Sequence, residues 1–277
     1  MRIAVVVAVC ACTPLTQVPP PKPSPIHDRA VAKDALHTGS LEPLHAMAQK
    51  TLAALVDVLG DAKKHAVENV LLDFDFGGGI TDVNAYATCA GDRPTVTVTD
   101  GLLEILRQLA LAHATDEVFG TDRMETYMRW SLSHHGQVPP VDQLYGDDRR
   151  VSELAWSLFV DELAFVIGHE LAHHYLGHLD CHSAQIGQLA LRVVPLFSQA
   201  AELAADAGSV ENTLEVGRDK EWTEDGAILV IQFFRSQQTI EGVVLAFIRT
   251  HPLAEIRLPT ITVTADIWRA TGGRLPL

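Results

Sequence analysis

The sequence has little positive charge, few aromatic residues and no long apolar run. Its 21 lysine and arginine residues are outnumbered by 35 aspartate and glutamate residues, so the formal net charge is −14 at pH 7. A chain of this charge without a basic cluster is not expected to bind nucleic acid or an anionic membrane through a basic surface. No apolar run reaches the roughly 18 residues of a membrane-spanning helix, so we expect no such helix.

Cysteine is also scarce, with four residues in the whole chain and no C-x-x-C metal pattern. Cys10 and Cys12 lie close to the amino terminus, which leaves Cys89 and Cys181. In an oxidising compartment these two residues can pair, but two unrelated buried thiols explain them equally well. The sequence leaves both possibilities open.

The composition is that of a folded globular protein. Hydrophobic residues make up 47% of the 277 residues and charged residues 20%. This length suits one sizeable domain, with or without a helical extension.

The amino terminus resembles an export signal of the lipoprotein type. Met1 and Arg2 precede a short apolar run that ends in Val9-Cys10-Ala11-Cys12, which is similar to a bacterial lipobox. We therefore predict a signal peptide over residues 1–11 and lipidation of Cys12. The proline-rich residues 12–26 cannot form a helix or a central strand and predict an extended tether.

This signal predicts a protein of the bacterial cell envelope that faces the periplasm and touches the membrane only through its lipid anchor. The residue after the lipidated cysteine is Thr13 rather than an aspartate. By the usual sorting pattern of envelope lipoproteins, this favours the outer membrane. The alternative is a soluble cytosolic protein with a frayed apolar start.

The rest of the chain, residues 27–277, is predicted to form one domain with a helical extension over 27–66. Apolar residues recur at helical spacing from Leu41 to Leu59, and Gly60 is a stop signal. The period then changes to that of strands, with turn residues between the runs. The predicted strands cover residues 70–76, 80–88 and 95–99.

Helices follow the predicted sheet. One opens at Gly101, and the polar stretch 115–150 is predicted to be an insertion that carries a short helix around Met124 to Leu132. A long helix is expected from about Val151 to the end of a histidine cluster, and another after Pro195.

The long helix contains His169-Glu170-Leu171-Ala172-His173, an H-E-x-x-H pattern. Residues four apart share one face of a helix, so both imidazoles can reach one metal ion with Glu170 beside it. Apolar residues on both sides of the pattern favour a buried helix. A chance pair of histidines is the alternative, because the chain has 13 of them.

The helix after Pro195 carries a second pattern, with Glu202 and Asp206 four residues apart among alanines. Two carboxylates so placed repel each other on a solvated surface, although an ordinary exposed acidic helix remains the alternative. Near the histidine helix they gain roles: Glu202 can bind the metal, and Asp206 can accept the N–H of a ligating imidazole.

At this point the sequence resembles the zinc metalloendopeptidase family of HtpX and the CAAX prenyl proteases, peptidase family M48, including its soluble periplasmic members. Five segments occur in the family's order and cover about residues 80 to 260. They are listed here as they stand in the chain: Val83-Asn-Ala-Tyr-Ala87, Gly101-Leu-Leu, Asp161 to His173, Glu202-Leu-Ala-Ala-Asp206 and Thr250-His-Pro-Leu-Ala-Glu-Ile-Arg257.

The resemblance implies one zinc ion per chain, held by His169, His173 and Glu202, with water in the fourth position and Glu170 as general base. It places His251 near the zinc, where this residue could gate the site or polarise a carbonyl. Arg257 could pair with acidic groups there.

Three further histidines, at positions 174, 178 and 182, are expected on a different face of the helix. That face lies about 100° or more from the metal-binding stripe, so we predict that none of the three is a ligand.

Taken together, the sequence predicts a mainly helical zincin-like domain of the α+β class, with a small sheet packed over the active helix. The strand from Thr81 to Thr88 should lie at the sheet edge, where an extended peptide could add as a further strand. Its predicted substrate-binding residues are Val83, Asn84, Ala85, Tyr86 and Ala87. The predicted function is a zinc metalloendopeptidase that cleaves unfolded or extended proteins. The alternative is a catalytically silent zinc-binding lipoprotein with a binding or chaperone-like role.

Overall fold

A computed structural model describes Leu36 and residues 40–75, 82–133, 148–181, 198–237, 251 and 254–273. Several predicted features lie outside these residues. They are the signal peptide, Cys12, the tether, the start of the helical extension, residues 80–81 of the predicted second strand, residues 134–147 of the insertion and His182.

The described residues form a mainly helical domain with a small sheet, which confirms the predicted fold class. The helices are α2 (Leu41–Asp57), α3 (Asp61–Ala66), α4 (Asp100–Phe119), α5 (Arg123–Ser133), α6 (Arg149–Tyr175), α7 (Gln199–Lys220), α8 (Asp225–Gln237) and α10 (Ala254–Thr271). The strands are β1 (Leu71–Asp75), β2 (Ala85–Ala90) and β3 (Arg93–Thr99).

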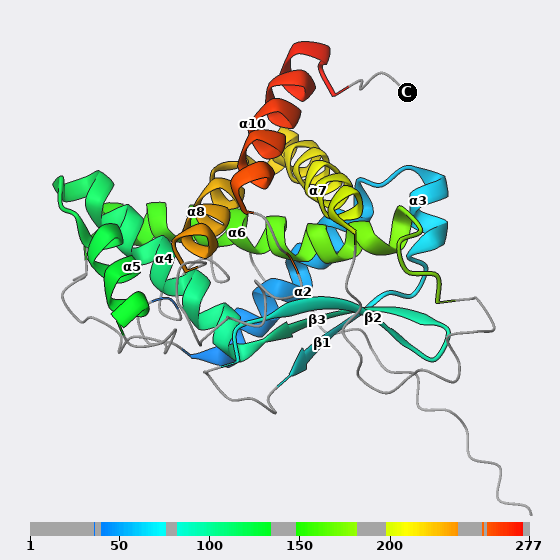
Figure 1. Cartoon of the computed structure of the whole chain (residues 1–277), viewed down its shortest axis with the longest axis horizontal. Helices are drawn as coiled ribbons and strands as arrows, with labels where there is room; N and C mark the ends of the chain where they lie inside the picture. Colours follow the sequence, from blue (N-terminus) through cyan, green and yellow to red (C-terminus); the bar gives the residue numbers. More distant parts are fainter. Residues whose placement is uncertain are drawn as a thin grey trace, which may run out of the picture.

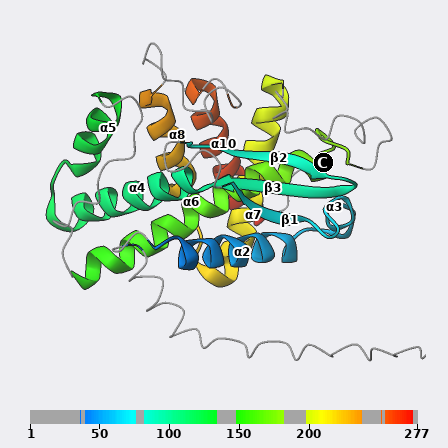
Figure 2. The ribbon, with the colours of Figure 1, turned by 90° about the horizontal axis from the view of Figure 1, so that it is seen from below.

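The three strands are arranged in the order β1-β3-β2 (Figure 2). β1 runs parallel to β3, whereas β2 and β3 form an antiparallel hairpin. Gly91 opens the two-residue turn with φ 68°, which suits the turn types that join antiparallel strands. Within the described sheet, β2 is therefore an edge strand, as predicted.

The second strand begins later and ends later than residues 80–88. Before Ala85, backbone groups of this segment bond to the side chain of Thr99 instead of to a neighbouring strand. The Thr99 hydroxyl accepts from the Asn84 N–H (2.9 Å) and donates to the Asp82 carbonyl (2.6 Å). At the other end, pairing continues to the hairpin turn, so that Ala90 still faces Arg93.

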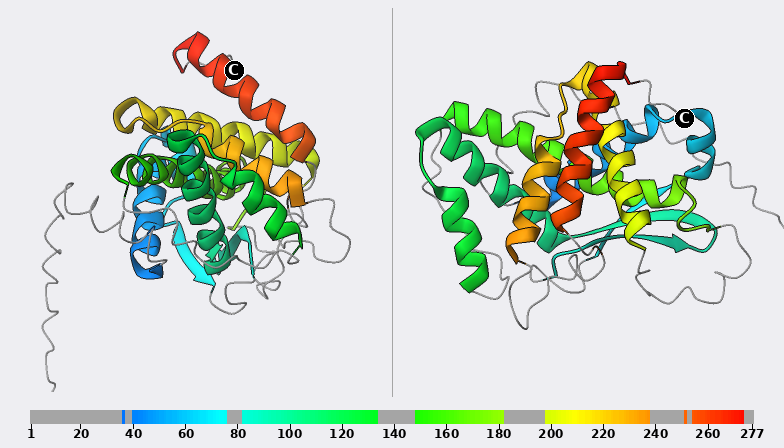
Figure 3. Two further views of the ribbon diagram at one scale, coloured as in Figure 1. Left: turned by 90° about the vertical axis from the view of Figure 1, so that its left-hand side faces the viewer. Right: turned by 45° about the horizontal axis from the view of Figure 1, so that its top comes forward.

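Helix α6 lies at the centre of the domain, between the sheet on one side and α7 and α8 on the other (Figure 1). It also packs against α2 and α4. Figure 3 shows α10 as an outer layer, which rests on α7 and α8. Because α6 is enclosed in this way, every residue from Leu158 to Tyr175 is buried.

Two helix boundaries differ from the sequence-based prediction. α4 continues to Phe119, five residues into the predicted insertion, because the helix stops only where Gly120 adopts φ 64°. α6 ends at Tyr175, short of the last histidines, and Gly177 follows with φ 74°. The short helix predicted inside the insertion is α5.

None of the described helices is long and apolar enough to span a membrane.

Candidate metal centre

His169, Glu170 and His173 lie in the buried part of α6, and each side chain is at most 1% exposed. Opposite them, α7 carries Glu202 and Asp206, which are equally buried. The two helix patterns that the sequence predicted to meet therefore do meet.

Small residues allow the two helices to approach this closely. A Cβ atom at Gly168 would lie 2.6 Å from Ser209 Oγ, and one at Gly208 would lie 2.5 Å from the hydroxyl of Tyr175. Ser209 Oγ in turn donates to the Phe165 carbonyl at 2.7 Å. One glycine on each helix, Gly168 on α6 and Gly208 on α7, therefore allows the close approach.

Four side chains bring one potential ligand atom each to a common point: His169, His173, Glu202 and His251. These four atoms all lie within 4.8 Å of one another. His169 Nε2 is 3.2 Å from His173 Nε2 and 3.2 Å from Glu202 Oε2. His251 Nδ1 completes the group, at 2.8 Å from Glu202 Oε2 and 3.2 Å from His169 Nε2.

The chemistry of this group suits a metal ion. Three imidazoles and one carboxylate are ligands that zinc and related ions prefer. Glu202 Oε1 is buried and accepts no hydrogen bond from any described residue. A buried carboxylate oxygen without a partner costs free energy, and a cation at this point would be that partner.

The structure adds His251 to the three metal ligands that the sequence predicted, as a fourth potential ligand. The sequence suggested only that this residue lies near the metal, whereas the structure places its Nδ1 among the potential ligands. Its Nε2 lies 3.3 Å from Glu170 Oε1 and 3.4 Å from the Ala85 carbonyl oxygen. Helix spacing could not reveal that Nδ1 joins the ligand atoms, because His251 is 82 residues away from His169.

Asp206 and Arg257 support His169 from behind. Asp206 Oδ1 lies 2.9 Å from His169 Nδ1, and Arg257 donates to both carboxylate oxygens of Asp206 at 2.8 and 2.6 Å. Burial would raise the pKa of Asp206, but the Arg257 guanidinium outweighs it and lowers that pKa. The aspartate therefore stays ionised and holds the proton of His169 Nδ1, so that Nε2 points toward the group.

The charges within the group are coupled. Burial lowers the pKa of His169, but hydrogen bonds to Asp206 and Glu202 exceed this effect and raise it to about 9. The pKa of Glu202 moves down, against the effect of burial, because of its hydrogen bonds to His169 and His251. Without a metal ion, a proton on His169 thus provides the positive charge that the two carboxylates require.

Glu170 stands beside the group rather than in it. It is fully buried, and neither of its carboxyl oxygens accepts a hydrogen bond from the described residues. Burial is the main reason that its pKa is raised. A carboxylate with a raised pKa is better suited to take a proton from water than an ordinary surface glutamate.

The remaining predicted histidines lie elsewhere. His174 Nε2 donates to the Thr95 carbonyl of β3 at 3.2 Å, on the sheet side of α6. His178 was expected on the helix with His174, but α6 ends before it. The turn at Gly177 instead folds His178 back, and its Nδ1 lies 3.0 Å from Nδ1 of His173.

The edge strand runs next to the group. Thr99 N donates to the Asn84 carbonyl at 3.0 Å, and Tyr86 is paired with Thr97 in the same register. Because backbone groups alternate along an antiparallel strand, those of Ala85 and Ala87 point away from β3. Of the predicted substrate residues, Val83 and Asn84 precede the strand. The hydroxyl of Tyr86 donates to Asp75 Oδ2 at 3.2 Å.

Cys89 and Cys181 form a disulfide, which resolves the alternatives that the sequence left open. The bond joins the far end of β2 to the turn after α6. A cross-link thus connects the sheet edge with the segment that follows the two histidines.

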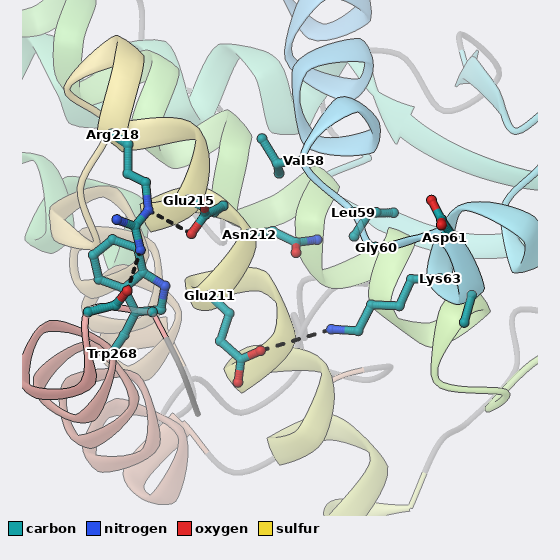
Figure 4. Close-up of a pocket in the computed structure, with 13 residues that line it drawn as sticks. Val58, Leu59, Gly60, Asp61, Lys63, Glu211, Asn212, Glu215, Arg218 and Trp268 are labelled. Carbon is teal, nitrogen blue, oxygen red and sulfur yellow. Dashed lines mark hydrogen bonds and ion pairs between the residues drawn. The ribbon is translucent and has the colours of Figure 1, made fainter. Parts of the chain in front are cut away.

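A hollow of about 610 Å³ is lined by residues of α3, α7 and the end of α10 (Figure 4). Four of its charged side chains form two pairs: Lys63 with Glu211 at 4.0 Å and Arg218 with Glu215 at 2.8 Å. None of its lining residues belongs to the metal-binding group.

A family model for peptidase family M48 matches residues 49–265 of the chain. Comparison with curated proteins and with solved structures finds no match. The family match spans most of the domain and includes all four potential metal ligands, Glu170, Asp206 and Arg257. The chain therefore belongs to peptidase family M48, whose members are metal-dependent peptidases.

Proposed function

We propose that this protein is a zinc-dependent endopeptidase that hydrolyses unfolded or extended polypeptides. The observation that carries the proposal is the position of Glu170, fully buried beside a group of convergent metal ligands and without a hydrogen-bond partner among the described residues. Membership of a peptidase family supports the same reaction. The three imidazoles and one carboxylate favour zinc.

Zinc at this site would supply Lewis-acid chemistry, polarising the scissile carbonyl and making a water molecule more acidic. His169, His173 and Glu202 would hold it. Glu170 would take the proton of the attacking water and pass it to the leaving amine, a role that its raised pKa supports. Asp206, fixed by Arg257, would keep His169 in the tautomer whose Nε2 lone pair is available.

The edge of β2 offers a binding place for the substrate backbone. An extended peptide can hydrogen-bond to the outward N–H and C=O groups of Ala85 and Ala87 as an added strand. Because the Ala85 carbonyl lies 3.4 Å from His251, a peptide bound there would pass directly beside the metal ligands. This mode recognises backbone rather than side chains, which suits substrates that lack a stable fold.

His251 fits a resting state of such an enzyme. With its Nδ1 among the ligand atoms, the site has four protein donors, whereas a catalytic zinc site keeps one position for water or substrate. We infer that His251 closes the site at rest and leaves that position during catalysis.

The four-donor arrangement also suits the alternative, a catalytically silent zinc protein with a binding or chaperone-like role. A structural zinc site is usually closed by four protein ligands. Glu170 favours the peptidase, since a structural site has no use for a buried carboxylate beside its ligands.

The test compares wild type, Glu170→Gln and His251→Ala, each purified with zinc and incubated with unfolded envelope proteins. Wild type should contain about one zinc per chain and cleave, whereas Glu170→Gln should keep its zinc and lose about 10²- to 10⁴-fold in rate. Equal cleavage by both would remove Glu170 as base. Zinc binding without cleavage, in wild type and in His251→Ala, would favour the silent protein.

We further propose that the protein is lipid-anchored at Cys12 and faces the periplasm. The Cys89–Cys181 disulfide supports an oxidising compartment. Mass spectrometry of the mature amino terminus in the native host tests the anchor, and an unprocessed Met1 would contradict it.

A further inference from the structure

The two histidines of the H-E-x-x-H pattern have different supports. Both direct Nε2 toward the metal-binding group, at 3.2 Å from each other. Nδ1 of His169 faces the carboxylate of Asp206 at 2.9 Å. Nδ1 of His173 faces another imidazole, that of His178, with the two Nδ1 atoms 3.0 Å apart.

The chemistry of imidazole assigns the direction of this second contact. A neutral histidine has one N–H donor and one lone-pair acceptor. If His173 gives its Nε2 lone pair to a metal ion, its proton must be on Nδ1. That N–H then donates to the Nδ1 lone pair of His178, and the proton of His178 lies on its Nε2.

The backbone places His178 at this position. The carbonyl of His173 accepts from the N–H of His178 at 2.9 Å and from that of Leu179 at 3.2 Å. Gly177, with φ 74°, allows the turn that makes both bonds possible. His178 therefore contacts the same residue through its backbone and through its ring.

The disulfide holds the far end of this turn. Cys181 stands three residues after His178 and is bonded to Cys89 at the end of β2. Cys181 Sγ also lies 3.8 Å from His174 Nδ1, and the His174 ring is anchored to β3 through the Thr95 carbonyl. Leu176, by contrast, is 39% exposed and adds little packing to the turn.

We propose that His178 is a positioning residue for the metal ligand His173, and that the Cys89–Cys181 disulfide holds His178 in place. The affinity of the site for a divalent metal ion then depends on a bond outside the metal-binding group. This inference rests on the metal-binding part of the proposed function and does not require cleavage of any substrate.

The test measures the dissociation constant for Zn²⁺ by competition with a chromogenic chelator, on the full chain. His178→Ala should weaken binding by about 10- to 100-fold, the usual effect of losing such a support. His178→Asn should restore most of the affinity, because Asn Oδ1 occupies the place of Nδ1 and can accept the same hydrogen bond. His65→Ala is the matched control, since His65 is 87% exposed and far from the group in the chain.

The disulfide is tested in the same assay with the double variant Cys89→Ser/Cys181→Ser. Its affinity should fall by a smaller factor than that of His178→Ala. In the His178→Ala background, removal of the disulfide should cause no further loss, because the two changes act through one contact. The absorption spectrum of the Co²⁺-loaded proteins should change in His178→Ala and return toward wild type in His178→Asn.

Several outcomes would overturn the inference. Wild-type affinity in His178→Ala would remove the positioning role, and so would equal losses in the alanine and asparagine variants when urea unfolding shows both to be folded. An undiminished disulfide effect in the His178→Ala background would show that the disulfide acts elsewhere. Absence of Zn²⁺ binding by wild type would overturn this inference together with the proposed function, whereas Zn²⁺ binding without peptidase activity would contradict the peptidase alone.

Discussion

Two groups of buried carboxylates lie on or against α6, and they differ in their partners. Glu202 and Asp206 meet His169, His251 and Arg257. Asp161 and Glu162, about two helical turns before His169, have no such cations among the described residues. Asp161 accepts from the hydroxyl of Thr223 at 2.8 Å, and Glu162 accepts from none of these residues.

The pKa shifts of the two groups follow their partners rather than their burial. Burial acts to raise the pKa of all four carboxyls, but the positive neighbours lower it for Glu202 and Asp206. Burial prevails for the other pair, where it raises the pKa of Asp161 to about 7 and that of Glu162 well above its usual range. A buried carboxylate alone therefore does not indicate a metal site; convergent donors do.

The largest change in stability should come from removing the positive partner of a buried carboxylate. Arg257→Gln leaves Asp206 buried without its main positive neighbour, which typically costs about 3 to 5 kcal/mol. Urea unfolding of the metal-free protein should show this loss as a lower midpoint with an unchanged slope. Arg149→Gln, which removes an exposed i,i+4 pair with Glu153, should leave the midpoint unchanged.

The pH dependence of stability tests the unpartnered pair. The folded-state pKa of Asp161 is about 7 and its ordinary value is 3.8. The stability that protonated Asp161 contributes to the folded state is therefore fully present below pH 3.8 and is lost as pH rises toward 7. We expect Asp161→Asn, which can still accept from Thr223, to gain stability over wild type across this range by about 4 kcal/mol, with a plateau above pH 7.

Unfolding midpoints measured at several pH values check this expectation. A constant difference between Asp161→Asn and wild type from pH 4 to pH 8 would show that the folded protein ionises Asp161 normally.

The smallest effect is expected at Glu162. Glu162→Met replaces a buried carboxyl, which has no hydrogen-bond partner in the described part of the chain, by an apolar side chain of similar length. Stability at neutral pH should therefore rise by about 1 to 3 kcal/mol. Zinc content should not change, because Glu162 is not among the converging ligands. A loss of zinc or of peptidase activity in a stably folded variant would instead give this carboxyl a functional role and break the comparison.

The sequence predicted those parts of the site that lie within one helix. His169 with His173, and Glu202 with Asp206, are each four residues apart, and helix geometry alone places each pair on one face. Apolar periodicity likewise predicted the helical fold and the small sheet. The boundaries were less accurate at Phe119 and Tyr175, where single glycines decide the helix end.

Contacts between elements were harder to predict. The resemblance of the segment from Thr250 to Arg257 placed His251 near the metal but did not make it a ligand. His178 carries no pattern that distinguishes a residue beside a metal ligand from an ordinary surface histidine. His178 was assigned to the helix because the histidine cluster continues past Tyr175, whereas Gly177 turns the chain back onto His173. The pairing of Cys89 with Cys181, 92 residues apart, could not be chosen over two free thiols.

The sequence by itself determined which chemical groups each helix presents, because the rise and twist of a helix relate residues three and four positions apart in every context. Only the tertiary structure decided which groups meet. The close approach at Gly168 and Gly208, the turn at Gly177 and the return of the chain to His251 are products of packing over long sequence distances, where no local periodicity constrains the outcome.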